Sequence, residues 1–233
     1  MHTTLTMIGF DADDTLWHNE RFFNLTQAHF VELLADYTDR NTLMARLLAA
    51  ERRNIPHYGF GIKGFTLSMI ETAIEVTDGR VPAQVITHLL DVGRDMLSHA
   101  VELLPHAAET IEALRHDFKV VVITKGDLLD QERKLAQSGL RDLFDGIEIV
   151  SAKTTDTYAR IFEAHGTGAD QGMMVGNSMA SDVVPMITAG GWGVFVPHGG
   201  SWEIEHAPTP DHHKYHEIED LGELAPLIAT LMV

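Results

Sequence analysis

The stretch IGFDADDTL at residues 8–16 decides the fold. It continues an apolar run, Leu5–Phe10, that is too short for a core helix and predicts a buried strand. Three acids follow within four residues, and carboxylates crowded at the end of a buried strand repel one another. A hard cation with oxygen ligands relieves that repulsion. A polar turn in which Asp14 or Thr15 caps a following helix is the competing interpretation.

The positions of Asp11 and Asp13 point to a site at the end of this strand. In an extended chain their side chains project to the same side, because the side-chain period is two. Open sheets with helices on both faces bind their ligands at the carboxyl ends of parallel strands. We therefore expect both aspartates to lie at a ligand-binding edge.

The second half of the chain alternates between helical and strand patterns. Apolar runs within residues 118–124, 147–150, 173–176 and 193–197 predict buried strands, and amphipathic segments between them predict helices. The alternation predicts an α/β fold, a doubly wound parallel sheet that includes Leu5–Phe10 as its first strand. The polar region 198–216 is expected to be a loop.

Residues 19–100 show only helical periodicity. Four helices are expected, separated by turn signals at 39–41, at Pro56, at 59–64 and at 78–79. We predict that residues 1–17 and 98–233 form the α/β catalytic core and that residues 18–97 form an inserted helical cap.

Composition narrows the function classes. The net charge is −17 over 233 residues, which argues against a nucleic-acid binder, and the absence of cysteine excludes disulfides and thiolate chemistry. No apolar run approaches the ~20 residues of a membrane span. We expect a cytoplasmic protein that binds neither nucleic acid nor membrane and is a monomer or a homodimer.

Three further strand ends carry polar groups. The hydroxyl of Thr124 could donate to a phosphoryl oxygen, and Lys153 could neutralise a phosphoryl group. Asn177 and Asp182 could complete an oxygen-ligand shell. Taken singly, each has a plainer interpretation as a helix cap or a solvated lysine. The fold, however, would bring all of these groups to one edge of the sheet.

The ordered set resembles the haloacid dehalogenase-like hydrolase superfamily, in its phosphatase branch with a helical cap. The resemblance rests on Asp11-x-Asp13-x-Thr15, Thr124, Lys153 and Gly176-Asn177-Ser178-x3-Asp182. It implies that Asp11 is the nucleophile and a Mg²⁺ ligand. It also implies that Asp13 is the general acid and base, with its carbonyl on the metal.

The same resemblance implies that Thr124 and Lys153 hold the transferring phosphoryl group and that Asn177 and Asp182 complete the metal shell. The acid at Asp13 favours phosphoryl transfer over dehalogenation, because an alkoxide leaving group needs a proton and a halide does not. Phosphatases of this family often have Asp where this chain has Asn177. We therefore expect weaker metal binding here than in an Asp-bearing relative.

The substrate is predicted to contact residues of the core and of the cap. These residues are Thr15, Lys125, Gly126, Tyr58, Phe60 and Lys63. For the cap segment, aromatic packing between helices is an equal alternative. A cap lysine that forms a Schiff base, as in phosphonate-cleaving relatives, is a less favoured one.

The sequence thus predicts a Mg²⁺-dependent phosphohydrolase acting on a small phosphate monoester, a phosphorylated metabolite, through an aspartyl-phosphate. A phosphomutase, a phosphonate hydrolase and a non-catalytic binding protein on the same fold are the alternatives.

Overall fold

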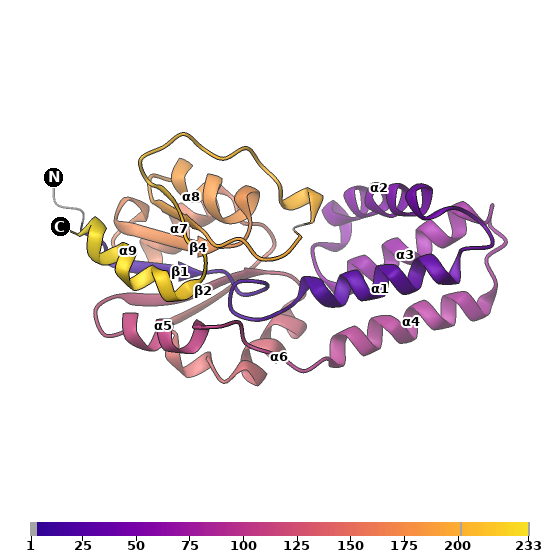
Figure 1. Cartoon of the computed structure of the whole chain (residues 1–233), viewed down its shortest axis with the longest axis horizontal. Coiled ribbons are helices and arrows are strands. Elements are labelled where there is room, and N and C mark those ends of the chain that lie inside the picture. Colours follow the sequence, from indigo (N-terminus) through magenta and orange to yellow (C-terminus); the bar gives the residue numbers. More distant parts are fainter. Residues whose placement is uncertain (1–3, 201, 233) are drawn as a thin grey trace. The chain divides into compact units, whose positions relative to one another are not determined.

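The computed structural model describes residues 4–200 and 202–232. Their contacts divide the chain into two compact units. One comprises the chain up to Glu20, Val101–Lys125 and everything from Glu132 onward, and the other comprises Arg21–Ala100 with Gly126–Gln131. Figure 1 shows that the first contains the sheet and that the second is helical.

The sheet has six strands, all parallel, in the order β3-β2-β1-β4-β5-β6. The strands are β1 (Met7–Phe10), β2 (Lys119–Lys125), β3 (Gly146–Val150), β4 (Gly172–Gly176), β5 (Trp192–Phe195) and β6 (Tyr215–Glu217). Phe10 pairs with Val122 on one side and with Val175 on the other. The predicted doubly wound parallel sheet is confirmed, and Asp11 directly follows its strand β1.

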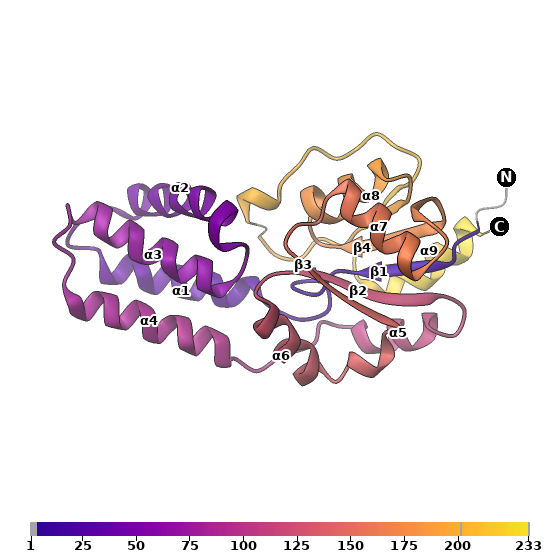
Figure 2. The same ribbon diagram turned by 180° about the vertical axis from the view of Figure 1, so that it is seen from behind.

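Helices cover both faces of the sheet (Figures 1 and 2). The helices of this unit are α5 (Ala107–Leu114), α6 (Leu128–Ser138) from Glu132 onward, α7 (Thr155–His165), α8 (Val184–Thr188) and α9 (Leu224–Leu231). Side chains alternate along each strand, as the period of two requires. Ile8 and Phe10 lie in a core with α5 and α9, whereas Met7 lies in a second core with α7 and Met186 of α8.

The expectation of a loop over 198–216 is wrong at its end, where Tyr215–Glu217 forms the edge strand β6. This strand has three residues and pairs only with β5. It is too short and too polar to show an apolar run. Within the same segment, Glu203–Glu205 forms a short 3-10 helix.

The helical unit has a core of its own. Its helices are α1 (Glu20–Leu33), α2 (Arg40–Tyr58), α3 (Ile62–Val76) and α4 (Ala83–Ser98). Buried side chains from all of them form one apolar cluster, which includes Phe30, Leu47, Met69 and Leu89. The hydrophobic surface in these helices is therefore buried largely against the unit's own side chains.

Two turn signals of this unit are wrong. Pro56 lies inside α2, which continues to Tyr58 and ends with Gly59 as its C-cap. Gly64, expected to be in the turn, lies in the first turn of α3. A proline costs a helix one backbone donor but does not always end it, and here the end comes at the glycine.

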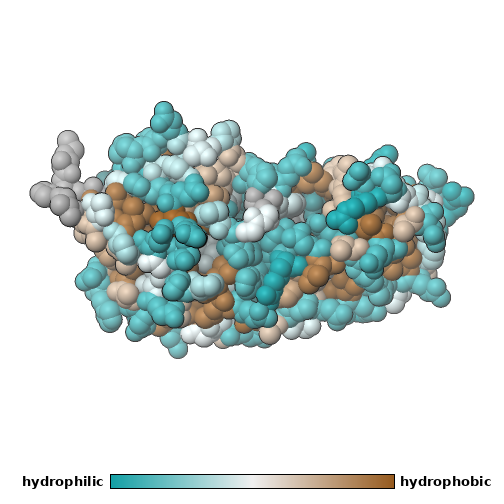
Figure 3. Space-filling view, viewed as in Figure 1, coloured by the Kyte–Doolittle hydropathy of each residue, from teal (hydrophilic) through white to brown (hydrophobic). Residues whose placement is uncertain are grey.

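The surface is mainly hydrophilic on the face seen in Figure 3, with apolar side chains gathered between α1 and α4. Leu25 of α1 and Leu90 of α4 are among the exposed large apolar residues. Within residues 4–200 and 202–232, no helix is both long and apolar enough to cross a membrane.

Candidate active site

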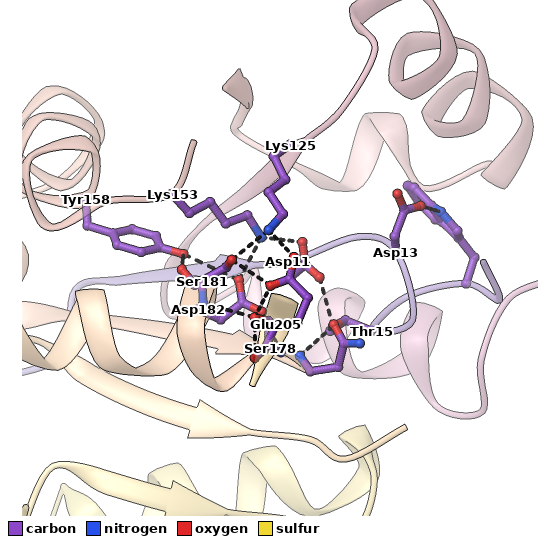
Figure 4. Close-up of polar contacts among 12 residues, drawn as sticks. Asp11, Asp13, Thr15, Lys125, Lys153, Tyr158, Ser178, Ser181, Asp182 and Glu205 are labelled. Atoms are coloured by element: carbon purple, nitrogen blue, oxygen red, sulfur yellow. Dashed lines mark hydrogen bonds and ion pairs between the residues drawn. The ribbon is translucent and has the colours of Figure 1, made fainter. Parts of the chain in front are cut away.

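Asp11 lies at the centre of the sheet edge. Its backbone N–H donates to the Val175 carbonyl (2.9 Å), so the residue extends the pairing of β1 with β4. Its side chain is 10% exposed. The Oδ1 atom pairs with the ammonium of Lys153, and Oδ2 accepts from the Thr15 hydroxyl (3.3 Å). Both carboxylate oxygens are therefore fixed (Figure 4).

Lys153 joins two carboxylates. It follows β3, its side chain is almost fully buried, and its Nζ donates to Asp11 Oδ1 and to Asp182 Oδ1 (2.7 Å). Burial opposes the charge of this ammonium. Asp11 and Asp182 outweigh that effect and raise the pKa of Lys153 above its usual range. Lys153 is therefore a fixed positive charge beside Asp11.

Asp182 is fully buried in a π-helical turn, Met179–Val183. Its Oδ2 accepts from the Ser178 backbone N–H (2.9 Å), and its Oδ1 accepts from Lys153 and from the Tyr158 hydroxyl (3.4 Å). Ser178 caps the same turn by accepting from the Ser181 N–H (2.9 Å). Both Asp182 oxygens thus accept hydrogen bonds from protein groups. Asp182 and Asp11 share the Lys153 ammonium as an ion-pair partner.

Tyr158 is a site residue that the sequence interpretation missed. It lies in α7 with its ring fully buried, and its hydroxyl donates to the Ser181 carbonyl (2.9 Å). Burial, together with the neighbouring acids, raises its pKa well above the usual value, so the hydroxyl stays protonated. The sequence pattern does not distinguish Tyr158 from the other buried residues of an amphipathic helix.

The electrostatics of Asp11 are finely balanced. Burial raises the pKa of its carboxyl, Lys153 lowers it, and the charge of Asp182 raises it again, which leaves the pKa at about 7. Two carboxylates share one buried ammonium, so the trio carries excess negative charge. An added cation would stabilise the ionised form of Asp11.

Asn177 lies beside Asp11, Asp13 and Thr15. Its N–H donates to the Thr15 hydroxyl (3.1 Å), and one atom of its side-chain amide lies 3.2 Å from the Asp13 carbonyl oxygen and 3.1 Å from Asp11 Oδ2. With nitrogen at that position, the amide donates to both oxygens. With oxygen there, the amide oxygen is separated from each of the other two by the ~3 Å spacing of adjacent ligands around octahedral Mg²⁺. The donor set therefore fits Mg²⁺.

Side chains alone do not build this metal site. Within the described part of the chain, no three His, Asp or Glu residues come together in a way that could hold a metal ion. A metal at Asp11 would therefore depend on the Asp13 carbonyl and the Asn177 amide. These neutral ligands were included in the sequence prediction, as was Asp182, whose metal contact stays a prediction.

Asp13 has partners of its own. Its carboxylate accepts from Lys134 Nζ (2.7 and 2.9 Å) and from the Trp17 indole N–H (2.7 Å). Figure 4 shows the side chain turned away from Asp11. The expectation that Asp11 and Asp13 project to the same side does not hold, because Asp13 lies beyond β1 and its carboxylate is held by Lys134 and Trp17.

Asp14 is a structural residue, as one interpretation of the motif proposed. It is buried, and its carboxylate accepts from the N–H groups of Asn19 and Glu20 (2.8 Å each). It thereby caps the start of α1. Burial nevertheless raises the pKa of this carboxyl.

The end of β2 brings Lys125 to a second ionic cluster. Thr124 is buried, and Lys125 follows it with its Nζ on the Ser181 hydroxyl (2.6 Å) and on the Glu205 carboxylate. Gly126 follows at φ +144°, a conformation that favours glycine. The sequence interpretation did not single out Glu205, which lies in a polar loop region.

The three predicted cap contacts, Tyr58, Phe60 and Lys63, lie in the helical unit around the start of α3. Lys63 is 54% exposed and pairs with Asp127 (Nζ to Oδ1, 3.4 Å). The Asp127 carboxylate also accepts from the Lys63 backbone N–H (3.2 Å), so it caps α3. Substrate contact by these three residues stays a prediction.

Known proteins provide the family context. The family model described as haloacid dehalogenase-like hydrolase matches residues 5–190. A haloacid dehalogenase-like family hydrolase from Xanthomonas campestris is 40% identical, with a TM-score of 0.88 over 98% of this chain and 92% of that one. No protein with a curated function matches the sequence.

More distant structures share the fold. The putative hydrolase YfnB from Bacillus subtilis, bound to magnesium, is 17% identical (TM-score 0.68, 97% of this chain and 99% of that one). L-2-haloacid dehalogenase from Xanthobacter autotrophicus is also 17% identical (TM-score 0.64, 97% and 98%). At these identities the likeness shows the fold alone, and the chemistry must be argued from the site.

Proposed function

Because this chain belongs to the haloacid dehalogenase-like hydrolases, we propose that it is a Mg²⁺-dependent phosphohydrolase acting on a small phosphate monoester. The buried carboxylate of Asp11 carries the proposal. One of its oxygens is fixed by Lys153, and the other lies beside the Asp13 carbonyl and the Asn177 amide. A carboxylate held this way can act as a nucleophile next to a cation site.

In the first step, an Asp11 oxygen attacks phosphorus and forms a P–O bond while the ester P–O bond breaks. The departing alkoxide takes its proton from Asp13. Lys153 remains on the site and stabilises the negative charge of the transferring group. Bound Mg²⁺ would supply further charge neutralisation, held by Asp11, the Asp13 carbonyl and Asn177.

In the second step, water attacks the aspartyl-phosphate and Asp13 takes a proton from that water. The P–O bond to Asp11 breaks, which releases inorganic phosphate and restores the carboxylate. Because Asp13 rests on Lys134 and Trp17, its side chain must exchange these partners for the leaving group during the cycle. In the absence of substrate, Lys134 then holds the Asp13 side chain in the position seen in this structure.

The acid at Asp13 favours this reaction over carbon–halogen cleavage, since halide leaves without a proton. The structure gives little support to a phosphonate hydrolase. Lys63 is exposed and paired with Asp127, whereas Schiff-base formation needs a desolvated neutral amine. A phosphomutase would use the same groups at Asp11 and differs only in the fate of the aspartyl-phosphate.

A panel of phosphate monoesters tests the proposal. With Mg²⁺ and no bisphosphate activator, we expect release of inorganic phosphate, and we expect EDTA to stop it. The same protein should release no halide from 2-haloacids. Phosphate release that requires a bisphosphate would indicate a mutase, and no turnover on any ester would leave the binding-protein alternative.

A further inference from the structure

Glu205 has no part in the reaction proposed above, yet its carboxylate is held by the active-site loops. It ends the short helix Glu203–Glu205, and its side chain is 14% exposed. Three donors converge on it: the Lys125 ammonium, the Ser178 hydroxyl and the Ser181 hydroxyl (2.7 Å). Figure 4 shows this cluster beside Asp182.

Glu205 carries a negative charge here. Burial alone would raise its pKa, but Lys125 and the two serine hydroxyls outweigh burial and lower it. The interaction is therefore a buried ion pair whose carboxylate has its hydrogen bonds satisfied, unlike a solvent-exposed surface salt bridge. The geometry alone shows that Glu205 is the ion-pair partner of Lys125.

The position of Lys125 explains why its partner matters. Lys125 ends β2, next to the strand β1 that leads to Asp11, and its Nζ also contacts Ser181, which directly precedes Asp182. Lys153 already serves Asp11 and Asp182. A second ammonium without its own anion would therefore add positive charge close to the carboxylates that face the cation site.

We propose that Glu205 is a positioning residue that holds Lys125 on the Ser178–Ser181 turn and cancels its charge. The Lys125–Glu205 pair thereby sets the balance between cation binding and anion binding at the active site. This inference rests on the proposed function, in which Mg²⁺ and a phosphoryl group bind beside Asp11.

The pair predicts effects of opposite sign on the two ligands. Glu205→Gln keeps the side chain's size and one hydrogen-bond-accepting oxygen, but it removes the negative charge that pairs with Lys125. We expect Mg²⁺ to bind about tenfold more weakly and phosphate to bind severalfold more tightly, because the loss of one negative charge disfavours a nearby cation and favours a nearby anion. Loss of packing alone would weaken both ligands.

The experiment is calorimetry on the full chain, with Mg²⁺ titrated into metal-free protein and inorganic phosphate titrated at saturating Mg²⁺. Glu203→Gln is the matched control, because it makes the same charge change at an exposed position of the same short helix. We expect it to leave both affinities within about twofold of wild type. Circular dichroism confirms that each variant is folded.

A double variant tests whether Glu205 acts through Lys125. Lys125→Met alone should strengthen Mg²⁺ binding and weaken phosphate binding, and Lys125→Met combined with Glu205→Gln should return both toward wild type. Shifts of the same sign for both ligands, no shifts, or an undiminished Glu205→Gln effect in the Lys125→Met background would overturn the inference. Wild-type protein that binds no Mg²⁺ would instead refute the proposed function.

Discussion

At the level of single residues, the chemistry depends on how Asp11 is charged. Burial resists its ionisation, and Lys153 supports it while also serving Asp182. The pKa of about 7 places Asp11 near the midpoint of its titration in neutral solution without metal. The extent to which Asp11, the proposed nucleophile, is ionised therefore depends on the positive charge near its carboxylate.

This balance makes the stability of the metal-free protein depend on pH. The folded pKa of Asp11, about 7, exceeds the ordinary value of 3.8, so folding takes up a proton between these values. Stability should therefore fall as pH rises from about 4 to 7, by on the order of 1 kcal/mol per pH unit at most. Asp11→Asn removes this dependence and should also abolish turnover.

Urea unfolding in EDTA at several pH values, for wild type and Asp11→Asn, measures the difference. Asp11 itself is the main contributor to that difference, because Lys153 and Tyr158, whose pKa values Asp11 also raises, titrate above this pH range. Parallel curves would show that Asp11 is ionised throughout the range.

The proposed general-acid role of Asp13 should make the effect of its substitution depend on the leaving group. Asp13→Asn retains the side chain's size but has no proton to give, so alkyl phosphates should lose about 100-fold or more in kcat. An activated aryl ester, such as p-nitrophenyl phosphate, should lose much less, because its phenolate leaves with little protonation. Rate constants for both esters decide the matter, and equal losses would argue against the general-acid role.

In the proposed function, Asn177 would set the charge of the metal site. Asn177→Asp replaces a neutral oxygen ligand by a charged one, so the concentration of Mg²⁺ that gives half-maximal activity should fall severalfold. Direct Mg²⁺ titration of wild type and variant measures the same change without turnover. An unchanged affinity would mean that Asn177 does not face the metal.

The sequence predicted some of these residues and could not predict others. Asp11, Thr15 and Asn177 come directly after or close to strands, so the parallel sheet alone brings them together. Lys134 and Glu205 reach the site from a helix and a polar loop, and their direction depends on side-chain placement in three dimensions. Local patterns hold no information about such long-range partners.

At the scale of elements, strand ends were easier to predict than turns. Buried strands leave clear apolar runs, whereas Pro56 signalled a turn in a helix that continues and β6 left no run at all. The motif after β4 folds as a π-helical turn, with Asp182 held by the Ser178 N–H. Such a turn shifts side-chain direction relative to an α-helix, and periodicity does not reveal it.

The start of α3 offers a prediction at this scale. Gly61 has φ +121°, and a Cβ there would lie 2.8 Å from Asp127 Oδ2. Gly59 has φ +77° and nothing within 4 Å of its Cβ position. Both alanine variants incur the backbone cost of about 1–3 kcal/mol, but only Gly61→Ala also disturbs the carboxylate that caps α3.

Thermal unfolding followed by circular dichroism should therefore show a lower Tm for Gly61→Ala than for Gly59→Ala. In an Asp127→Ala background the gap between the two should narrow, and the remainder reflects the Asp127 backbone nitrogen, which would lie 3.0 Å from the new Cβ. An unchanged gap there would show that the Asp127 carboxylate does not cause the difference.

At the scale of the whole molecule, separate segments of an acidic chain bring three lysines and their carboxylate partners to one edge of the sheet. The chain carries a net charge of −17, yet Lys125, Lys134 and Lys153 each pair with a carboxylate at or beside the edge where Asp11 lies. The overall charge predicts weak, nonspecific attraction of cations. An experiment must therefore distinguish Mg²⁺ bound at a specific site from Mg²⁺ attracted by the net negative charge of the chain.

The tryptophans provide a means to do so. The chain has three, Trp17, Trp192 and Trp202, and all lie in the unit that contains the sheet. Their fluorescence therefore follows unfolding of that unit.

A ligand that binds only the folded site, present at 100 times its dissociation constant, stabilises the folded protein by about 2.7 kcal/mol. Mg²⁺ should raise the fluorescence-detected Tm by several degrees at constant ionic strength, whereas the Asp11→Asn variant should show little of this shift. An equal shift in both proteins would show that Mg²⁺ stabilises the acidic chain without occupying the site beside Asp11.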